Sequence, residues 1–344
     1  MITVYADEQA LHDGKAELTD GQLLPCFEQP RRALMIRDRV REVGLGSIVP
    51  PEDQGRGPIE RVHAPAFVDV LATAWERWTA MGRTFDALPS AWPVRHMGRT
   101  PPERIDGLLG WYSFDAATPV TADTWRAVYA SAQTALTAAR LIADGQERAA
   151  FALSRPPGHH AASDLYGGYC FLNNAAIAAQ HLLDRGAGRV AILDVDYHHG
   201  NGTQAIFYDR PDVLFVSLHA HPSVEFPYFL GWPDETGTGA GEGFNRNYAL
   251  PVGTAFPAWR EALEDALRSI AGYGPDVLVV SLGVDTYRGD PISQFRLASD
   301  DFTAYGGLIA RLRLPTLFVM EGGYAVEAIG LNTVNVLTGF EAGS

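Results

Sequence analysis

From residue 149 onward, short runs of apolar and β-branched residues recur along the chain, and each closes on a polar or glycine-rich turn. Nearly continuous runs, such as Val190-Ala191-Ile192-Leu193, are typical of strands that helices cover on both faces. A helical pattern follows each run, so the alternation predicts a parallel α/β sheet. The predicted strands cover residues 149–153, 189–195, 213–218, 277–282 and 316–320.

Helical patterns with recognisable ends fill the sequence between and before these strands. Pro30 opens one helix and Gly44 closes it, because proline suits the first turn and glycine the turn after the end. We expect an α/β fold in which residues 1–344 form a single domain, with a central, mostly parallel sheet flanked by helices on both faces. The predicted helices cover residues 30–43, 66–80, 123–143, 173–184, 257–271, 300–312 and 325–337.

Two long segments lack a clean period, and such stretches inside a compact domain usually have a function. Residues 82–119 contain Trp92, Trp111 and Tyr112 among turns, and aromatic residues on long loops are typical interface anchors. We expect this segment to be an inserted loop that forms a homodimer interface and a substrate entrance. Residues 220–247 are rich in glycine, proline and aromatic residues, and we expect them to form a pocket wall.

The chain carries a formal net charge of −14 at pH 7, which attracts cations and repels nucleic acid. Its two cysteines are too few for a disulfide framework, so metal chemistry must use histidines and carboxylates. No apolar run approaches the roughly 20 residues that span a bilayer, and the N-terminus lacks a signal-peptide pattern. We expect a cytoplasmic protein that binds neither nucleic acid nor membrane.

Polar clusters follow four of the predicted strands, which is where open parallel sheets bind ligands. Four such clusters at one edge of the sheet predict a functional site there. The clusters are Arg155-Pro156-Pro157-Gly158-His159-His160, the run from Asp194 to Gly202, Gly283-Val284-Asp285 and Glu321-Gly322-Gly323-Tyr324.

Asp196, His198 and Asp285 form a candidate metal centre. Side chains alternate along an extended chain, so Asp196 and His198 point to the same side and can share one ion. Asp285, at a neighbouring strand end, supplies a third ligand and leaves a position open for water and substrate, as catalytic zinc sites require. Iron(II) is an alternative that two carboxylates and one histidine also suit.

Candidate proton-transfer groups lie at two further strand ends. His159 and His160 follow a rigid Pro-Pro-Gly turn, and one of them can take a proton from the attacking water. Tyr324 follows two glycines, which let the backbone turn and bring the phenol near the metal. Its hydroxyl can donate a hydrogen bond to the oxyanion that develops during amide hydrolysis.

Together these motifs resemble the histone deacetylase family, which has the arginase/deacetylase fold, and most closely its acetylpolyamine amidohydrolase branch. The resemblance covers nearly the whole chain. The motifs that carry it are RPPGHH at 155–160, GGYCFLNN at 167–174, DVDYHHGNGTQ at 194–204, SLGVD at 281–285 and MEGGY at 320–324. The branch is indicated by KAEL at 15–18, WPVR at 92–95 and DPIS at 290–293.

The resemblance implies the same metal ligands and the same proton-transfer and oxyanion groups as the residue chemistry above. It also implies roles that spacing alone does not assign. These are Asp194 behind His159, Gly168 as a backbone acceptor for the substrate amide, Tyr169 and Phe226 as tunnel walls, and Asp194 with Ser217 in a structural potassium site.

Two departures from the family pattern concern the substrate. Asn201 stands where many histone deacetylases have an aspartate behind the second histidine, which favours a non-histone substrate. Asp106 and Ala117 replace glutamates that acetylpolyamine-type members carry at the entrance, so the preferred amine length stays open. We still expect Glu17, Asp106 and Asp115 to surround the entrance and attract the distal cation of an amine.

The leading hypothesis is zinc-dependent hydrolysis of the acetyl amide of a small cationic amine, such as acetylputrescine, acetylcadaverine or acetylspermidine. A protein or peptide acetyl-lysine deacetylase is an alternative with the same chemistry and a more open entrance. A noncatalytic binder of acetylated ligands is an alternative of another class.

Overall fold

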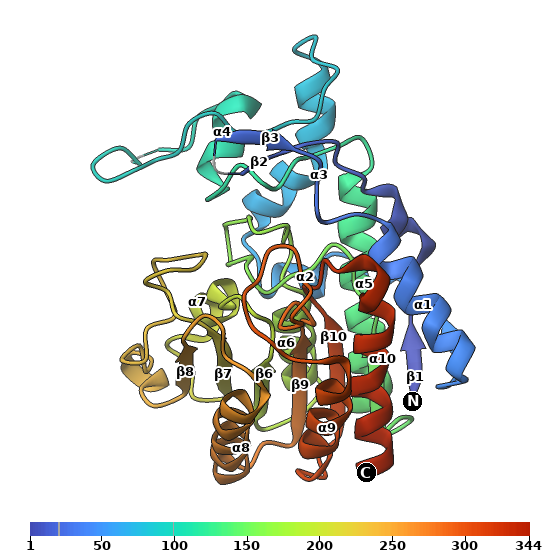
Figure 1. Cartoon of the computed structure of the whole chain (residues 1–344). Coiled ribbons are helices and arrows are strands. Elements are labelled where there is room, and N and C mark those ends of the chain that lie inside the picture. Colours follow the sequence, from blue (N-terminus) through green and yellow to red (C-terminus); the bar gives the residue numbers. More distant parts are fainter. Residues whose placement is uncertain (20, 99) are drawn as a thin grey trace.

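In the described part of the chain, eight parallel strands form one sheet in the order β4-β1-β5-β10-β9-β6-β7-β8 (Figure 1). The structure is a computed structural model that describes residues 1–19, 21–98 and 100–344. Strands β6, β9 and β10 are buried along their whole length, as their continuous apolar sequences predict. The strands are β1 (Ile2–Val4), β4 (Ile48–Val49), β5 (Ala149–Ala152), β6 (Val190–Asp194), β7 (Val213–Ala220), β8 (Asn245–Leu250), β9 (Val277–Leu282) and β10 (Thr316–Met320).

The predicted parallel sheet is confirmed, and the five predicted strands correspond to β5, β6, β7, β9 and β10. The sequence prediction missed three strands near the two edges of the sheet. Strands β1 and β4 have only three and two residues, and β8 begins with Asn245-Arg246-Asn247. None of the three contains a long apolar run, because polar residues are tolerated near an edge and short strands carry little pattern.

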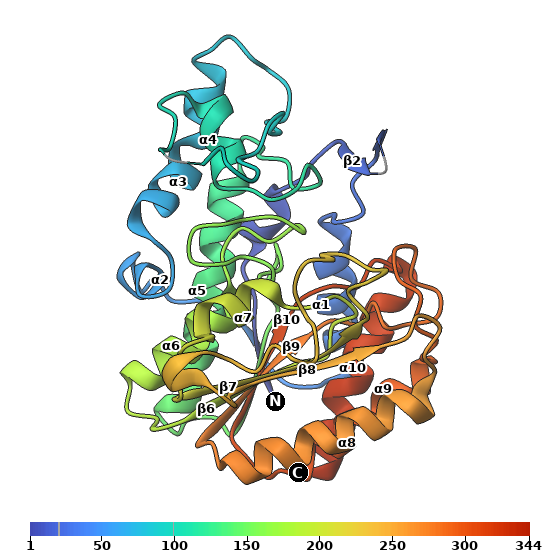
Figure 2. The same cartoon turned by 90° about the vertical axis from the view of Figure 1, so that its left-hand side faces the viewer.

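Helices cover both faces of the sheet, which Figure 2 shows nearly edge-on. Helices α1, α8, α9 and α10 pack on one face, in an apolar cluster that includes strand side chains such as Phe151. Helices α5 and α6 pack on the other face, against side chains such as Ala150, because successive strand residues point in opposite directions. The helices are α1 (Arg31–Val43), α2 (Gly57–Glu60), α3 (Pro65–Thr79), α4 (Ile105–Trp111), α5 (Thr124–Ala143), α6 (Asn174–Asp184), α7 (Asn201–Phe207), α8 (Phe256–Tyr273), α9 (Ser299–Ala310) and α10 (Val326–Gly343).

Residues 82–119 form less of a loop than their sequence suggests. The segment contains α4, and Tyr112 at the end of this helix packs with α3 and α5 in an apolar cluster and is only 8% exposed. The expectation that Tyr112 is an exposed anchor is therefore wrong, because α4 is amphipathic and folds onto the chain's own core. Val94 and Met97 do lie on the surface. Residue 99 of this segment lies outside the described residues.

A separate antiparallel hairpin, β2 (Glu17–Thr19) and β3 (Gln22–Leu24), lies in the upper part of Figure 1, and Figure 2 shows that it is well separated from α3 and α4. It is not part of the central sheet, and the Leu18 amide donates a hydrogen bond to the Ala116 carbonyl at 3.1 Å. Among residues 1–19, 21–98 and 100–344, no helix is both long enough and apolar enough to cross a bilayer.

Candidate active site

The structure brings the three predicted metal ligands together. Asp196 and His198 follow β6, and Asp285 follows β9, which pairs directly with β6. All three residues are buried, and their ligand atoms lie within 4.8 Å of one another. The Nδ1 atom of His198 is 3.1 Å from Oδ2 of Asp285 and 3.4 Å from Oδ1 of Asp196.

This donor set fits a divalent metal ion. Burial and the neighbouring Asp196 carboxylate raise the pKa of Asp285 to about 7, so the two carboxylates repel each other in a site with little water. A divalent cation between them would remove this repulsion. Two carboxylate oxygens and one imidazole nitrogen suit zinc or iron(II), and three protein ligands leave coordination positions for other molecules.

The paired histidines lie beside this centre, and each has a different partner. The Nδ1 atom of His159 is 2.9 Å from Oδ2 of Asp194, while Nδ1 of His160 is 2.7 Å from the amide oxygen of Asn201. The two rings are 4.0 Å apart between centroids. Both residues are buried, so their charges depend strongly on these neighbours.

The two histidines differ in charge, because their surroundings shift their pKa values in opposite directions. Burial alone would lower the pKa of His159, but the carboxylates of Asp196 and Asp194 outweigh it and raise this pKa to about 10. Burial and the positive charges of His159 and His198 hold the pKa of His160 well below its ordinary value. His160 is therefore the neutral member, and the one that can accept a proton.

Tyr324 completes the group of predicted catalytic residues. It lines the same pocket as His160 and His198, and its ring lies 5.4 Å from that of Tyr169 between centroids. The Arg32 guanidinium sits 4.7 Å from the Tyr324 ring centroid. Gly322 lets the backbone before Tyr324 lie close to the predicted metal ligands, since a Cβ there would lie 2.5 Å from carboxylate oxygens of Asp196 and Asp285.

A pocket of about 480 Å³ opens onto His160, His198 and Tyr324. Tyr169 and Phe226 form part of its wall, as predicted, and the Phe226 ring meets the His160 ring edge-on at 5.1 Å between centroids. Gly168 also lines it. The other lining residues are Glu17, Leu18, Thr19, Leu24, Phe27, Asp115, Ala117, Glu225, Tyr228, Pro291 and Ile292.

The predicted entrance carboxylates separate into two groups. Glu17 lines the pocket, where it accepts hydrogen bonds from the Tyr169 hydroxyl at 2.9 Å and from the Phe27 amide at 3.2 Å. Asp115 also lines the pocket, and burial raises the pKa of both carboxylates. Asp106 does not line it.

Asp106 instead lies on α4, where it forms ion pairs with Arg83 at 3.1 Å and Arg104 at 2.8 Å. The expectation that it is an entrance residue is therefore wrong for the pocket of one chain. Its charge is already matched by two arginines that sequence spacing could not pair with it.

Sequence analysis missed a third carboxylate in the pocket, Glu225. It accepts hydrogen bonds from the Tyr197 hydroxyl at 2.6 Å and from the Phe226 amide at 3.1 Å. Two signals were available, since Glu225 is next to the predicted wall residue Phe226 and lies within residues 220–247, which were expected to form a pocket wall. The irregular segment around it has no periodicity that would reveal the direction of a side chain.

The two residues of the predicted potassium site, Asp194 and Ser217, face each other in the β6–β7 register. Both are fully buried. The Oδ1 atom of Asp194 accepts a hydrogen bond from the Asp196 amide at 3.1 Å, and the Ser217 hydroxyl lies 2.8 Å from Nδ1 of His219. The first of these contacts holds the backbone at Asp196, and the second lies within β7.

Fold and site together define a parallel α/β protein with a buried candidate metal centre beyond the carboxyl ends of its central strands. The family model of the histone deacetylase domain matches residues 26–340. The chain therefore belongs to the histone deacetylase family, whose members depend on a metal.

Relatives within this family match over almost their whole length. Acetylpolyamine amidohydrolase 2 of Pseudomonas aeruginosa is 59% identical over 341 residues, which cover 99% of each chain. Acetylpolyamine amidohydrolase of Mycoplana ramosa is 49% identical and covers 98% of this chain and 99% of its own. The crystal structure of acetylpolyamine aminohydrolase from Burkholderia pseudomallei superposes with a TM-score of 0.95 at 41% identity, covering 100% of this chain and 99% of that one.

Proposed function

We propose that this chain hydrolyses the acetyl amide of N-acetylated diamines or polyamines to acetate and the free amine, with zinc as its metal. The observation that carries this proposal is one pocket that joins three carboxylates to His160, His198 and Tyr324. The names of relatives with 49% and 59% identity support the same substrate class.

Asp196, His198 and Asp285 would hold the zinc ion, and iron(II) is the alternative that the same ligands suit. When bound, the metal would polarise the acetyl carbonyl and lower the pKa of water. Asp194 and Ser217 would contribute to a structural potassium site. Metal content of the purified protein, measured together with the activity restored by zinc or iron(II) to the stripped protein, decides between the two metals.

The chain's own groups would carry the proton transfers. Neutral His160 accepts a proton from water as the water oxygen attacks the carbonyl carbon, and then gives it to the amine nitrogen as the C–N bond breaks. Protonated His159 contributes positive charge beside the reacting atoms. The Tyr324 hydroxyl donates a hydrogen bond to the carbonyl oxygen as negative charge develops there. The Gly168 carbonyl would accept the substrate N–H and fix its direction.

The distal ammonium of the substrate would lie among the pocket carboxylates. Glu17 and Asp115 line one part of the pocket and Glu225 lies beside Phe226 in another, so a cation in the pocket gains from several negative charges. The net charge of −14 supports a small cationic partner rather than nucleic acid.

A side-by-side comparison of substrates tests the proposal. We expect hydrolysis of acetylputrescine, acetylcadaverine or acetylspermidine with a higher kcat/KM than that of an acetyl-lysine peptide. A higher value for the peptide would favour the protein deacetylase. Tight binding of all four without release of acetate would favour the noncatalytic binder.

We also propose that the chain forms a homodimer through the surface of residues 82–119. Val94 and Met97 are 63% and 62% exposed, and the half-buried Trp111 lies in the same groove. Trp92 is held in place because its indole N–H donates to the Ser113 hydroxyl at 2.9 Å. Sedimentation at micromolar concentration should give twice the monomer mass, and Val94→Asp should give the monomer.

A further inference from the structure

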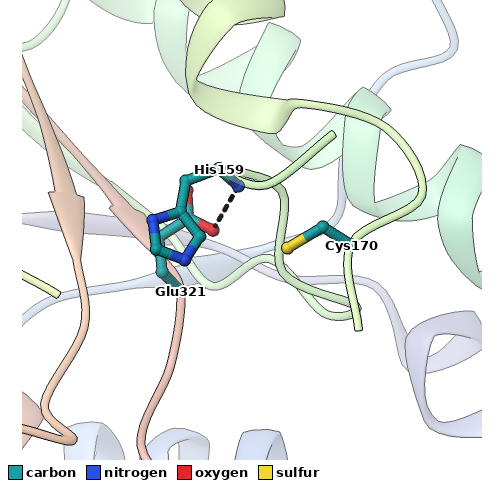
Figure 3. A group of neighbouring side chains, drawn as sticks. All are labelled: His159, Cys170 and Glu321. Carbon is teal, nitrogen blue, oxygen red and sulfur yellow. Dashed lines mark hydrogen bonds between the residues drawn. The ribbon is translucent and has the colours of Figure 1, made fainter. Parts of the chain in front are cut away.

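The side chain of Glu321 contacts the turn that carries the catalytic histidines. Its Oε2 atom accepts hydrogen bonds from the backbone amides of Gly158 at 2.6 Å and His159 at 3.1 Å. Figure 3 shows the carboxylate directly beside the His159 backbone. The Ser281 hydroxyl donates to its other oxygen at 3.3 Å, and Glu321 is fully buried. This one side chain therefore fixes the start of the histidine pair.

The backbone of Glu321 leads into the turn that carries Tyr324. Arg32 donates to the carbonyl oxygens of Glu321 and Gly323, each at 2.6 Å. The amide of Gly322 donates to Oδ2 of Asp196 at 2.8 Å. Two glycines in succession would otherwise leave the turn free to move. Glu321 is thus held at both its side chain and its backbone.

His159, Cys170 and Glu321 also have the spacing of metal ligands, and all three are buried. Each of these residues already uses a polar atom in a hydrogen bond. Glu321 binds two backbone amides, Nδ1 of His159 faces Asp194, and the Cys170 thiol donates to the Gly168 carbonyl at 3.3 Å. Within the group, Glu321 and His159 form a hydrogen-bonded junction between two turns of the site.

We propose that Glu321 is a positioning residue that fixes His159 and Tyr324 relative to each other across the active site. The inference rests on the proposed function for its kinetic consequences. Glu321 does not line the pocket. Its side chain forms hydrogen bonds with Gly158, His159 and Ser281, none of which is a predicted metal ligand. Its effect must pass through the geometry of two turns that meet the reacting atoms, and a displacement of about 1 Å there can cost about 100-fold in rate.

Two substitutions separate geometry from charge. Glu321→Gln keeps the length of the side chain, so its amide oxygen can accept from Gly158 and His159 while its NH₂ group donates to Ser281. Glu321→Asp keeps the charge but is one methylene shorter and cannot reach both amides. The matched controls are Glu327→Gln and Glu327→Asp on α10, where the side chain is 75% exposed.

We expect Glu321→Asp to lower kcat by about 100-fold with KM within about threefold of wild type and with metal retained. Glu321→Gln should stay within about fivefold of wild type, as should both Glu327 variants. A normal kcat for Glu321→Asp, or an equal loss in Glu321→Gln, would overturn the positioning role. A loss confined to KM would also overturn it, since a misplaced catalytic group acts on the chemical step.

Crystal structures of the variants give a readout that needs no turnover. In Glu321→Asp the separation between the His159 ring and the Tyr324 hydroxyl should differ from wild type, and in Glu321→Gln it should not. An unchanged separation in Glu321→Asp contradicts the proposal, whichever substrate the protein uses. Failure of the wild-type protein to hydrolyse any acetyl amide would contradict the proposed function instead, and the crystallographic comparison would still decide the role of Glu321.

Discussion

The Nδ1 atom of His160 lies 2.7 Å from the amide oxygen of Asn201. This partner is neutral, so it fixes the direction of the imidazole without adding the negative charge that Asp194 gives to His159. A carboxylate in the same place would stabilise the protonated form of His160 and raise its pKa. Asn201 thus orients the proposed base without the full charge of a carboxylate, while burial and the charges of His159 and His198 lower its pKa.

Asn201→Asp should shift the acidic limb of the pH–rate profile upward. The limb marks protonation of the base, so a raised His160 pKa moves it to higher pH by about one unit. Activity should begin to fall at a higher pH in the variant than in wild type. A full profile of kcat/KM between pH 5 and pH 9 checks this, and an unshifted limb would remove Asn201 from control of the base.

Asp285→Ala should abolish both tight metal binding and hydrolysis. It removes one of three ligands and leaves His198 and Asp196 to hold the ion alone. Elemental analysis after dialysis gives the metal content directly. The surface variant Asp53→Ala serves as a control, and full metal occupancy in Asp285→Ala would exclude Asp285 as a ligand.

Tyr324→Phe should lower kcat by about 100-fold while the metal content stays unchanged. The substitution keeps the ring that packs against Tyr169 and Arg32 but deletes the hydrogen bond to the developing oxyanion. Single-turnover kinetics with metal analysis on the same sample measures both quantities. A near-normal rate would show that the hydroxyl has no part in catalysis.

Removal of a pocket carboxylate should weaken selectivity for charged substrates. In Glu17→Gln and Glu225→Gln, the advantage of acetylcadaverine over an uncharged acetamide of equal length should shrink. Added salt should weaken the contribution of the half-buried Glu225 more than that of the fully buried Glu17, because salt screens buried charges less. Glu42→Gln on the exposed face of α1 changes net charge equally and is the control. If the advantage persists in both pocket variants, pocket shape sets the selectivity.

Acid should destabilise the fold in part through His63. This residue is 1% exposed and its Nε2 atom accepts a hydrogen bond from the Asn173 amide at 2.9 Å, and burial lowers its pKa to about 4. Between pH 6.5 and pH 4 the unfolded chain therefore binds one more proton than the folded chain.

The free energy of unfolding should then fall as pH drops through this window, by about 1.4 kcal/mol per pH unit and about 3 kcal/mol in total from His63. Urea unfolding of wild type and His63→Gln at several pH values measures the slope. The slope should be smaller in the variant, and equal slopes would show that His63 does not titrate differently on folding.

The sequence by itself determined the parallel α/β architecture, the strands that carry the site and the chemistry at their ends. Strands such as β6 and β9 are buried on both faces, so their apolar runs appear directly in the sequence. Asp196 and Asp285 follow those runs, and the carboxyl ends of paired parallel strands must lie together. Local pattern and one topological rule were enough for the proposed metal centre.

Only the tertiary structure decided the contacts made by turns and irregular segments, whose sequences have no hydrophobic period. Glu321 meets Gly158 across 163 residues, Asp106 is neutralised by two arginines, and Glu225 reaches the pocket from an irregular segment. Tyr112 is buried because a short amphipathic helix folds back onto the core. Periodicity indicates which side of an element faces the core. The partners of a side chain in distant segments depend instead on how whole elements pack against one another.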